Sequence, residues 1–159
     1  MKLYYFIILS LFIACQSETT TTVDENPNPP AEGFNLEASD EEAIALADQV
    51  MEAMGGRKAW DETRYQTWNF FGRRKLFWDK QTGDVQIDIL DDSLQIYLNY
   101  KDDSKGAVYK NGMAYTAQDS IKKYVEKGKG IWINDSYWLV MPFKLKDSGV
   151  TLKYKGKDT

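Results

Sequence analysis

The chain has 159 residues, and positions 1–14 and 15–33 have the character of an export signal and a linker, so one domain over residues 34–159 is expected. It contains no His and a single Cys, which excludes imidazole-based catalytic triads, His- or Cys-ligated zinc and intramolecular disulfides. The formal net charge is −4, and nucleic acid is not expected as a partner, because phosphate binding needs a basic surface. No cofactor is expected.

The N-terminus has the pattern of a secretory signal peptide. Lys2 supplies a positive charge, and residues 3–14 are apolar apart from Ser10. A helix of this length would span about 18 Å, whereas the hydrocarbon of a bilayer is about 30 Å thick. The segment is therefore interpreted as a signal that is removed, and not as a membrane span.

The junction after this segment, Phe12-Ile13-Ala14-Cys15, resembles a bacterial lipobox. That resemblance implies that the Cys15 thiol receives a diacylglycerol and becomes the N-terminus of the mature protein. The alternative is an ordinary buried thiol at the end of an apolar stretch. Because Gln16 follows the Cys where Asp would favour inner-membrane retention, we expect a lipid-anchored protein of the cell envelope, at the outer membrane and facing the periplasm or the cell surface.

Residues 15–33 are expected to form a disordered, Thr- and Pro-rich tether. The stretch 16–33 contains three of the four Pro residues, a four-Thr run and no aromatic residue. Such a segment buries too little apolar surface to offset the entropy of ordering it. A flexible chain of this length reaches roughly 25 Å, which would hold the domain clear of a membrane surface.

The first helix of the domain is predicted after Ser39. Ser39 and Glu42 have the spacing of a capping box, and Gly55-Gly56 is a stop signal. An apolar stripe at helical spacing is expected to lie on a sheet, and it comprises Ile44, Ala47, Val50, Met51 and Met54. A second, short helical turn over 57–62 would carry Trp60 toward the same core.

From Tyr65 onward the apolar period changes to two, which predicts strands. The expected ranges are 65–71, 73–78, 85–90, 94–100, 106–110 and 113–116. The connections are too short for parallel crossovers, and Asn111-Gly112 is a strong hairpin signal. In residues 94–100, Ile96 faces one side and Tyr97 the other, so one face is dry and the other wetter. The predicted fold is α+β: a curved antiparallel β-sheet, or incomplete barrel, with the N-terminal helix and a short helical insertion packed on its concave face.

The helical insertion is predicted after the sixth strand. Ser120 would cap a helix over 121–127 that Gly128 ends, and another turn is expected over 134–140. A last strand is predicted over 150–154. Its outer edge would be unpaired, so a protein partner or self-association is expected there.

Two groups of motifs carry a family resemblance. The first runs from Met54-Gly55-Gly56 through Ala59-Trp60-Asp61 to Trp78-Asp79, and the second is the continuous segment 131–144. They resemble a group of bacterial envelope lipoproteins, which is in turn similar to the outer-membrane lipoprotein carrier and receptor (LolA/LolB-like) fold, an incomplete antiparallel barrel with helices over a hydrophobic cleft. The resemblance covers about residues 43–155, and it implies a fold with further C-terminal strands, relative to which this chain would be short.

Three Trp residues are the candidates for ligand contact. A half-barrel lined by Trp and Tyr suits acyl chains or sugar rings, and Trp68, Trp132 and Trp138 come from segments expected near its open mouth. Plain core packing is the alternative for each of them, and it is favoured for Trp60 and Trp78.

Signals for catalysis and metal binding are weak. Residues 120–123 match S-x-x-K, but the companion elements of penicillin-binding enzymes are missing or out of order. The pairs at 91–92 and 102–103 are typical of hairpin tips more than of glycosidase carboxylates. Residues 79–84 lack the oxygen-rich spacing of a calcium loop. We therefore expect neither a catalytic residue nor a metal site.

Two functions of different classes follow. The expected one is a non-catalytic, lipid-anchored envelope lipoprotein that binds a hydrophobic or amphipathic ligand, such as a lipid or a lipoprotein acyl chain, in its concave sheet. The alternative is an interaction or scaffolding lipoprotein whose partner completes the sheet. An enzyme acting on envelope glycan is a more distant alternative.

Lipidation of Cys15 can be tested directly. Intact-mass analysis of membrane-extracted protein should show a chain that begins at Cys15 and carries added acyl mass. Cys15→Ala should release the protein from the membrane fraction, because the acyl chains contribute about 0.8 kcal/mol of anchoring per buried CH₂. A mature protein that retains an unmodified Met1 would contradict the assignment.

Overall fold

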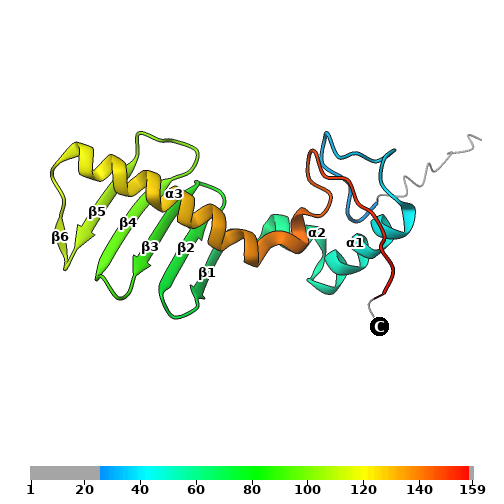
Figure 1. Cartoon of the computed structure of the whole chain (residues 1–159), viewed down its shortest axis with the longest axis horizontal. Helices are drawn as coiled ribbons and strands as arrows, with labels where there is room; N and C mark the ends of the chain where they lie inside the picture. Colours follow the sequence, from blue (N-terminus) through cyan, green and yellow to red (C-terminus); the bar gives the residue numbers. More distant parts are fainter. Residues whose placement is uncertain (1–25, 158–159) are drawn as a thin grey trace, which may run out of the picture.

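The computed structural model describes residues 26–157 and contains a β-sheet with helices (Figure 1). Six antiparallel strands lie side by side in sequence order, and the sheet is curved and does not close. The strands are β1 (Tyr65–Phe70), β2 (Arg74–Asp79), β3 (Asp84–Ile89), β4 (Leu94–Asn99), β5 (Gly106–Lys110) and β6 (Met113–Ala114). The helices are α1 (Glu41–Ala53), α2 (Gly56–Glu62), α3 (Gln118–Val140) and the short 3-10 helix η1 (Met141–Lys144). The predicted α+β fold with an incomplete antiparallel barrel is confirmed.

Short hairpins join the strands because their turns carry suitable residues. Asn111 and Gly112 adopt positive φ angles of 50° and 75°, the conformation of a two-residue turn that Asn-Gly favours. Phe71 and Gly72 do the same between β1 and β2, with φ angles of 51° and 70°. These tight connections keep successive strands adjacent and antiparallel.

The core lies on one face of the sheet, beneath α3. Strand register places Leu76, Ile87, Ile96 and Val108 opposite one another in neighbouring strands, and none of them is more than 1% exposed. Because successive residues of a strand point to opposite faces, this apolar row is confined to one side. The other side of the sheet is left to polar and aromatic side chains.

α3 is a single helix of 23 residues, about 34 Å long at 1.5 Å per residue. The prediction of a short helix over 121–127 ended by Gly128, with a separate turn over 134–140, is wrong. Gly128 lies within the helix, where a Cβ would stand 2.9 Å from the side chains of Ile96 and Leu98. Glycine is needed there for close approach to β4, and not to stop the helix.

α1 does not lie on the sheet, contrary to expectation. It packs against α2 and η1, beyond the β1 side of the sheet (Figure 1). Its apolar stripe buries Ala47 and Met51 there. The expected capping box is also absent, because Ser39 Oγ donates to the Asn35 carbonyl and accepts the Leu152 N–H.

Residues 26–33 pack against α1 and the segment after η1. Asn28 is 5% exposed and donates through Nδ2 to Asp48 Oδ1 at 2.7 Å, and the buried Lys146 Nζ lies 2.6 Å from the same oxygen. The expectation of a disordered tether over 15–33 is therefore wrong for its last eight residues. The rest of the expected tether and the signal segment lie outside the described residues.

Residues 150–154 do not form the predicted last strand. The Val150 and Leu152 carbonyls accept the N–H groups of Asn35 and Asp40, and the Tyr154 N–H donates to the Asp40 carboxylate. The segment is held beside residues 35–40, away from the sheet, so the argument for a partner at its edge no longer applies. The outer strands of the sheet are β1 and β6.

A matched pair of glycines in α3 tests the packing of this helix. Gly128→Ala should lower the free energy of unfolding by about 1–3 kcal/mol, because the new Cβ must displace the Ile96 and Leu98 side chains. Gly130→Ala should raise it by about 0.5–1 kcal/mol, since its Cβ position is open and alanine favours a helix. Urea unfolding followed by circular dichroism measures both, and equal effects would contradict the close approach at Gly128.

Candidate ligand site on the open face of the sheet

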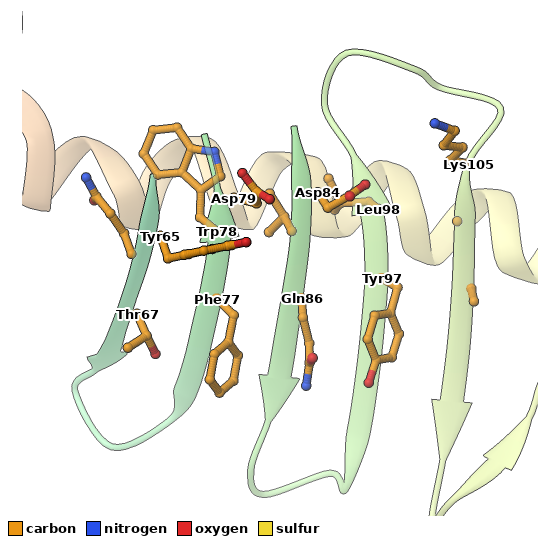
Figure 2. Close-up of a pocket in the computed structure, with 14 residues that line it drawn as sticks. Tyr65, Thr67, Phe77, Trp78, Asp79, Asp84, Gln86, Tyr97, Leu98 and Lys105 are labelled. Carbon is orange, nitrogen blue, oxygen red and sulfur yellow. The ribbon is translucent and has the colours of Figure 1, made fainter. Parts of the chain in front are cut away.

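The face of the sheet opposite α3, here called the open face, carries a continuous row of side chains across five strands. Strand register pairs Thr67 with Phe77, Phe77 with Gln86, Gln86 with Tyr97 and Tyr97 with Ala107. α3 lies behind the strands when this face is viewed from the front (Figure 2). The row is therefore turned toward solvent and not toward the core.

A depression of about 750 Å³ lies over this row (Figure 2). Its walls are mainly apolar, and Phe77 and Tyr97 lie on either side of Gln86 on its floor. The two rings come from strands two positions apart in the sheet, so their backbones are about 9.6 Å apart. The volume falls within the roughly 300–1,000 Å³ of typical small-molecule sites.

One end of the depression is polar and carries two carboxylates, Asp79 and Asp84 (Figure 2). Arg64 donates to Asp79 through Nε and Nη2, the shorter distance being 2.8 Å. This guanidinium, together with the N–H groups of Thr82 and Gln81, holds the pKa of Asp79 well below its ordinary value. Asp79 is therefore an anion at neutral pH.

Asp84 is held as an anion by neutral side chains. Asn99 Nδ2 donates to Oδ1 at 2.7 Å, and Thr82 Oγ1 donates to Oδ2 at 2.8 Å. These hydrogen bonds lower the pKa of Asp84, with the Asn99 amide as the larger cause. The polar end of the depression thus presents two fixed, ionised acceptors beside the aromatic rings of the floor.

Hydrogen bonds and an aromatic contact hold the floor in place. Gln86 and Gln95 each donate an amide N–H to Asp88 Oδ1, at 2.8 and 3.2 Å. Tyr109 packs edge to face on Tyr97, with ring centroids 5.7 Å apart. A ligand would therefore meet side chains that are already ordered, which lowers the entropy lost on binding.

The three Trp residues predicted to contact a ligand do not meet at one site. Trp68 and Trp132 are partly buried against the core on the helix side, and Trp132 stacks on Tyr100 with ring centroids 4.6 Å apart. Trp138 lies on α3 and is 73% exposed. None of the three lines the open-face depression, and Cys15 lies outside the described residues. Ligand contact by these Trp residues stays a prediction.

Sequence reasoning misses Phe77 and Tyr97 as site residues. The alternation in residues 94–100 already places Tyr97 on the wetter face, and the structure agrees. The usable signal is a large aromatic side chain on the polar face of a strand, where core packing does not require one. A choice of site residues by their Trp content selects the helix side of the sheet instead, where most Trp side chains pack in or against the core.

Within residues 26–157, no group of three or more His, Cys, Asp and Glu side chains is placed to hold a metal ion, and none of the helices has the length and apolar character of a membrane span. Comparison with protein-family models, curated proteins and solved structures finds no match. The functional interpretation therefore rests on the geometry of the open face.

Acid should weaken the fold through the Arg64–Asp79 pair. A carboxyl whose pKa is lower in the folded than in the unfolded chain stabilises the fold above the unfolded pKa, about 3.9 for Asp, and this contribution is lost as the pH falls below that value. Asp79→Asn should therefore be less stable than the wild type at about pH 7, and the two should converge toward about pH 2. Urea unfolding across this range measures the difference, and parallel pH profiles would refute it.

Proposed function

We propose that this protein is a non-catalytic binding protein of the cell envelope, lipid-anchored through Cys15, that holds an amphipathic ligand on the open face of its sheet. The observation that carries the proposal is the depression of about 750 Å³ with Phe77, Gln86 and Tyr97 on its floor. A site of this size, with mainly apolar walls and its charged groups at one end, fits a ligand with an apolar body and a polar head. A lipid or a lipoprotein acyl chain has this character.

The polar end supplies the means to orient such a ligand. Asp79 and Asp84 offer ionised acceptors, and Lys105 at the same end offers a donor. A headgroup with hydroxyl or ammonium donors pairs with the carboxylates, and an anionic group pairs with the lysine. The apolar part then lies across the two rings, where burial contributes about 25 cal/mol per Å² of apolar surface.

Binding accounts for the two carboxylates better than glycan hydrolysis does. A general acid needs a raised pKa to keep its proton at neutral pH. The pKa values of Asp79 and Asp84 are lowered instead, and both carboxylates already accept hydrogen bonds from Arg64 and Asn99. Neither carboxylate therefore supplies the proton that a leaving sugar requires.

Truncation of the open-face aromatics tests the proposal. Phe77→Ser and Tyr97→Ser should each weaken the binding of a fluorescent fatty-acid probe about tenfold or more, because loss of about 1.4 kcal/mol of contact is a tenfold change in affinity. Both side chains lie outside the buried core cluster, so the fold should persist by circular dichroism.

Two further variants locate the site. Phe71→Ser removes an aromatic that is 81% exposed in the β1–β2 turn, outside the depression, and should leave probe affinity unchanged. Trp138→Ala tests whether the probe binds on the α3 side of the sheet. If this variant loses probe binding while Phe77→Ser binds the probe normally, the ligand site lies at α3 and not on the open face. A wild-type protein that takes up no probe would remove the support for ligand binding altogether.

A further inference from the structure

The side of α3 that faces the sheet continues beyond the sheet. The sheet-facing positions of its first half recur at helical spacing and comprise Tyr124, Val125, Gly128, Ile131 and Trp132, which lie against the core. Two helical turns after Ile131 and Trp132, the same face of the helix carries Trp138 and Leu139. These two side chains are 73% and 39% exposed.

They are exposed because no strand of the described chain lies beneath them. α3 packs on β3, β4 and β5, and its C-terminal half passes beyond β1, the outermost strand on that side (Figure 1). Ile133 and Tyr137 in the same half are also mostly exposed, but helical spacing places them on the outer side of α3, away from the sheet. An apolar helix surface is therefore left uncovered where the sheet ends.

The charge of α3 changes at the same place. Residues 118–129 carry six charged side chains, whereas residues 130–141 carry only Asp135, which is buried in its ion pair with Arg74. The exposed part of the C-terminal half is therefore uncharged and rich in aromatic residues. Contiguous apolar surfaces of this kind mark sites of contact with another molecule.

β1 offers free backbone groups on the same side of the molecule. The Lys80 N–H donates to the Arg64 carbonyl, and in an antiparallel pair such bonds recur at every second residue. The intervening residues Tyr65, Thr67 and Asn69 therefore direct their N–H and C=O groups away from β2. No strand pairs with this edge in the described chain.

The β1 edge lacks the features that keep free edges from pairing. Residues 65–70 include no charged residue and no Pro, and their length is that of an ordinary strand. A groove of about 470 Å³ adjoins this edge, with walls from Trp60 of α2, Leu139 of α3 and Phe143 of η1. β6, at the opposite edge, is only two residues long and offers little to pair with.

We propose that β1 accepts one further strand from a partner polypeptide, which runs along its free edge beneath the C-terminal half of α3. Side chains of the added strand alternate in direction. Apolar ones face Trp138, Leu139 and Phe143, and polar ones face the open side beside Thr67. Because the edge and the uncovered helix surface carry no charge, the complementary strand has an uncharged central segment.

A single strand fits this place better than a second copy of the chain. α2 and α1 lie beyond β1 on the same side (Figure 1), so a second sheet placed edge to edge would meet them. One added strand needs only about 4.8 Å. The inference does not depend on the ligand proposed for the open face.

A displayed library of ten-residue peptides with apolar residues at alternate positions tests the proposal on the purified full chain. Selected peptides should slow hydrogen exchange of the Tyr65, Thr67 and Asn69 amides about tenfold or more on binding, because these N–H groups become paired. Thr67→Pro should lower the affinity of the protein for the selected peptides about tenfold or more. It removes an outward N–H and is tolerated at a strand edge.

Trp138→Glu is a second variant that leaves the strands of the sheet unchanged, and it should lower peptide affinity by a similar factor. Met113→Glu is its matched control, because Met113 is 71% exposed at the opposite edge, and it should leave peptide binding unchanged. A control library has the same amino-acid composition but no alternation of apolar and polar positions. If the alternating library yields no more binding peptides than this control, the proposal is overturned. Peptides that bind Thr67→Pro and Trp138→Glu as tightly as the wild type would also overturn it. Dimers whose β1 amides lose protection on dilution would assign the edge to a second copy instead.

Discussion

The buried ion pair between Arg74 of β2 and Asp135 of α3 sets the arrangement of the molecule. Arg74 donates through Nε and Nη2 to both carboxylate oxygens, at 2.7 and 3.0 Å, and Asp135 is 1% exposed. Removing one partner of a buried pair costs about 3–5 kcal/mol, because a charge is left without compensation. The pair therefore ties a specific turn of α3 to a specific strand and prevents the helix from sliding along the sheet.

Several features follow from that placement of α3. Gly128 lies directly over β4, where a Cβ would crowd Ile96 and Leu98, and the first half of the helix closes the apolar face of the sheet. The opposite face stays open, so Phe77 and Tyr97 remain accessible on either side of Gln86. The C-terminal half extends past β1, which leaves Trp138 uncovered. The open-face site and the unpaired β1 side are thus consequences of one helix position.

The sheet could be predicted closely because its determinants are local. Apolar alternation and turn residues such as Asn111-Gly112 act between neighbours in the chain, and the observed strand bounds lie within two residues of the expected ones. The helices were harder to predict. Gly128 has the local character of a helix stop, and only its contact with β4 explains why α3 continues. Ser39 has the spacing of a capping residue, yet its hydroxyl is occupied by Asn35 and by Leu152.

The sequence by itself determined the antiparallel strands, their order and the face on which each strand residue lies, because strand period and hairpin chemistry are properties of short segments. Only the tertiary structure decided the roles of the aromatic residues. Trp132 and Trp138 lie on one helix only six positions apart, but a sheet covers the first and none covers the second. Residues 150–154 likewise have the period of a strand, yet Asn35 and Asp40 supply their backbone partners. Such outcomes depend on contacts between segments far apart in the chain, which local periodicity does not encode.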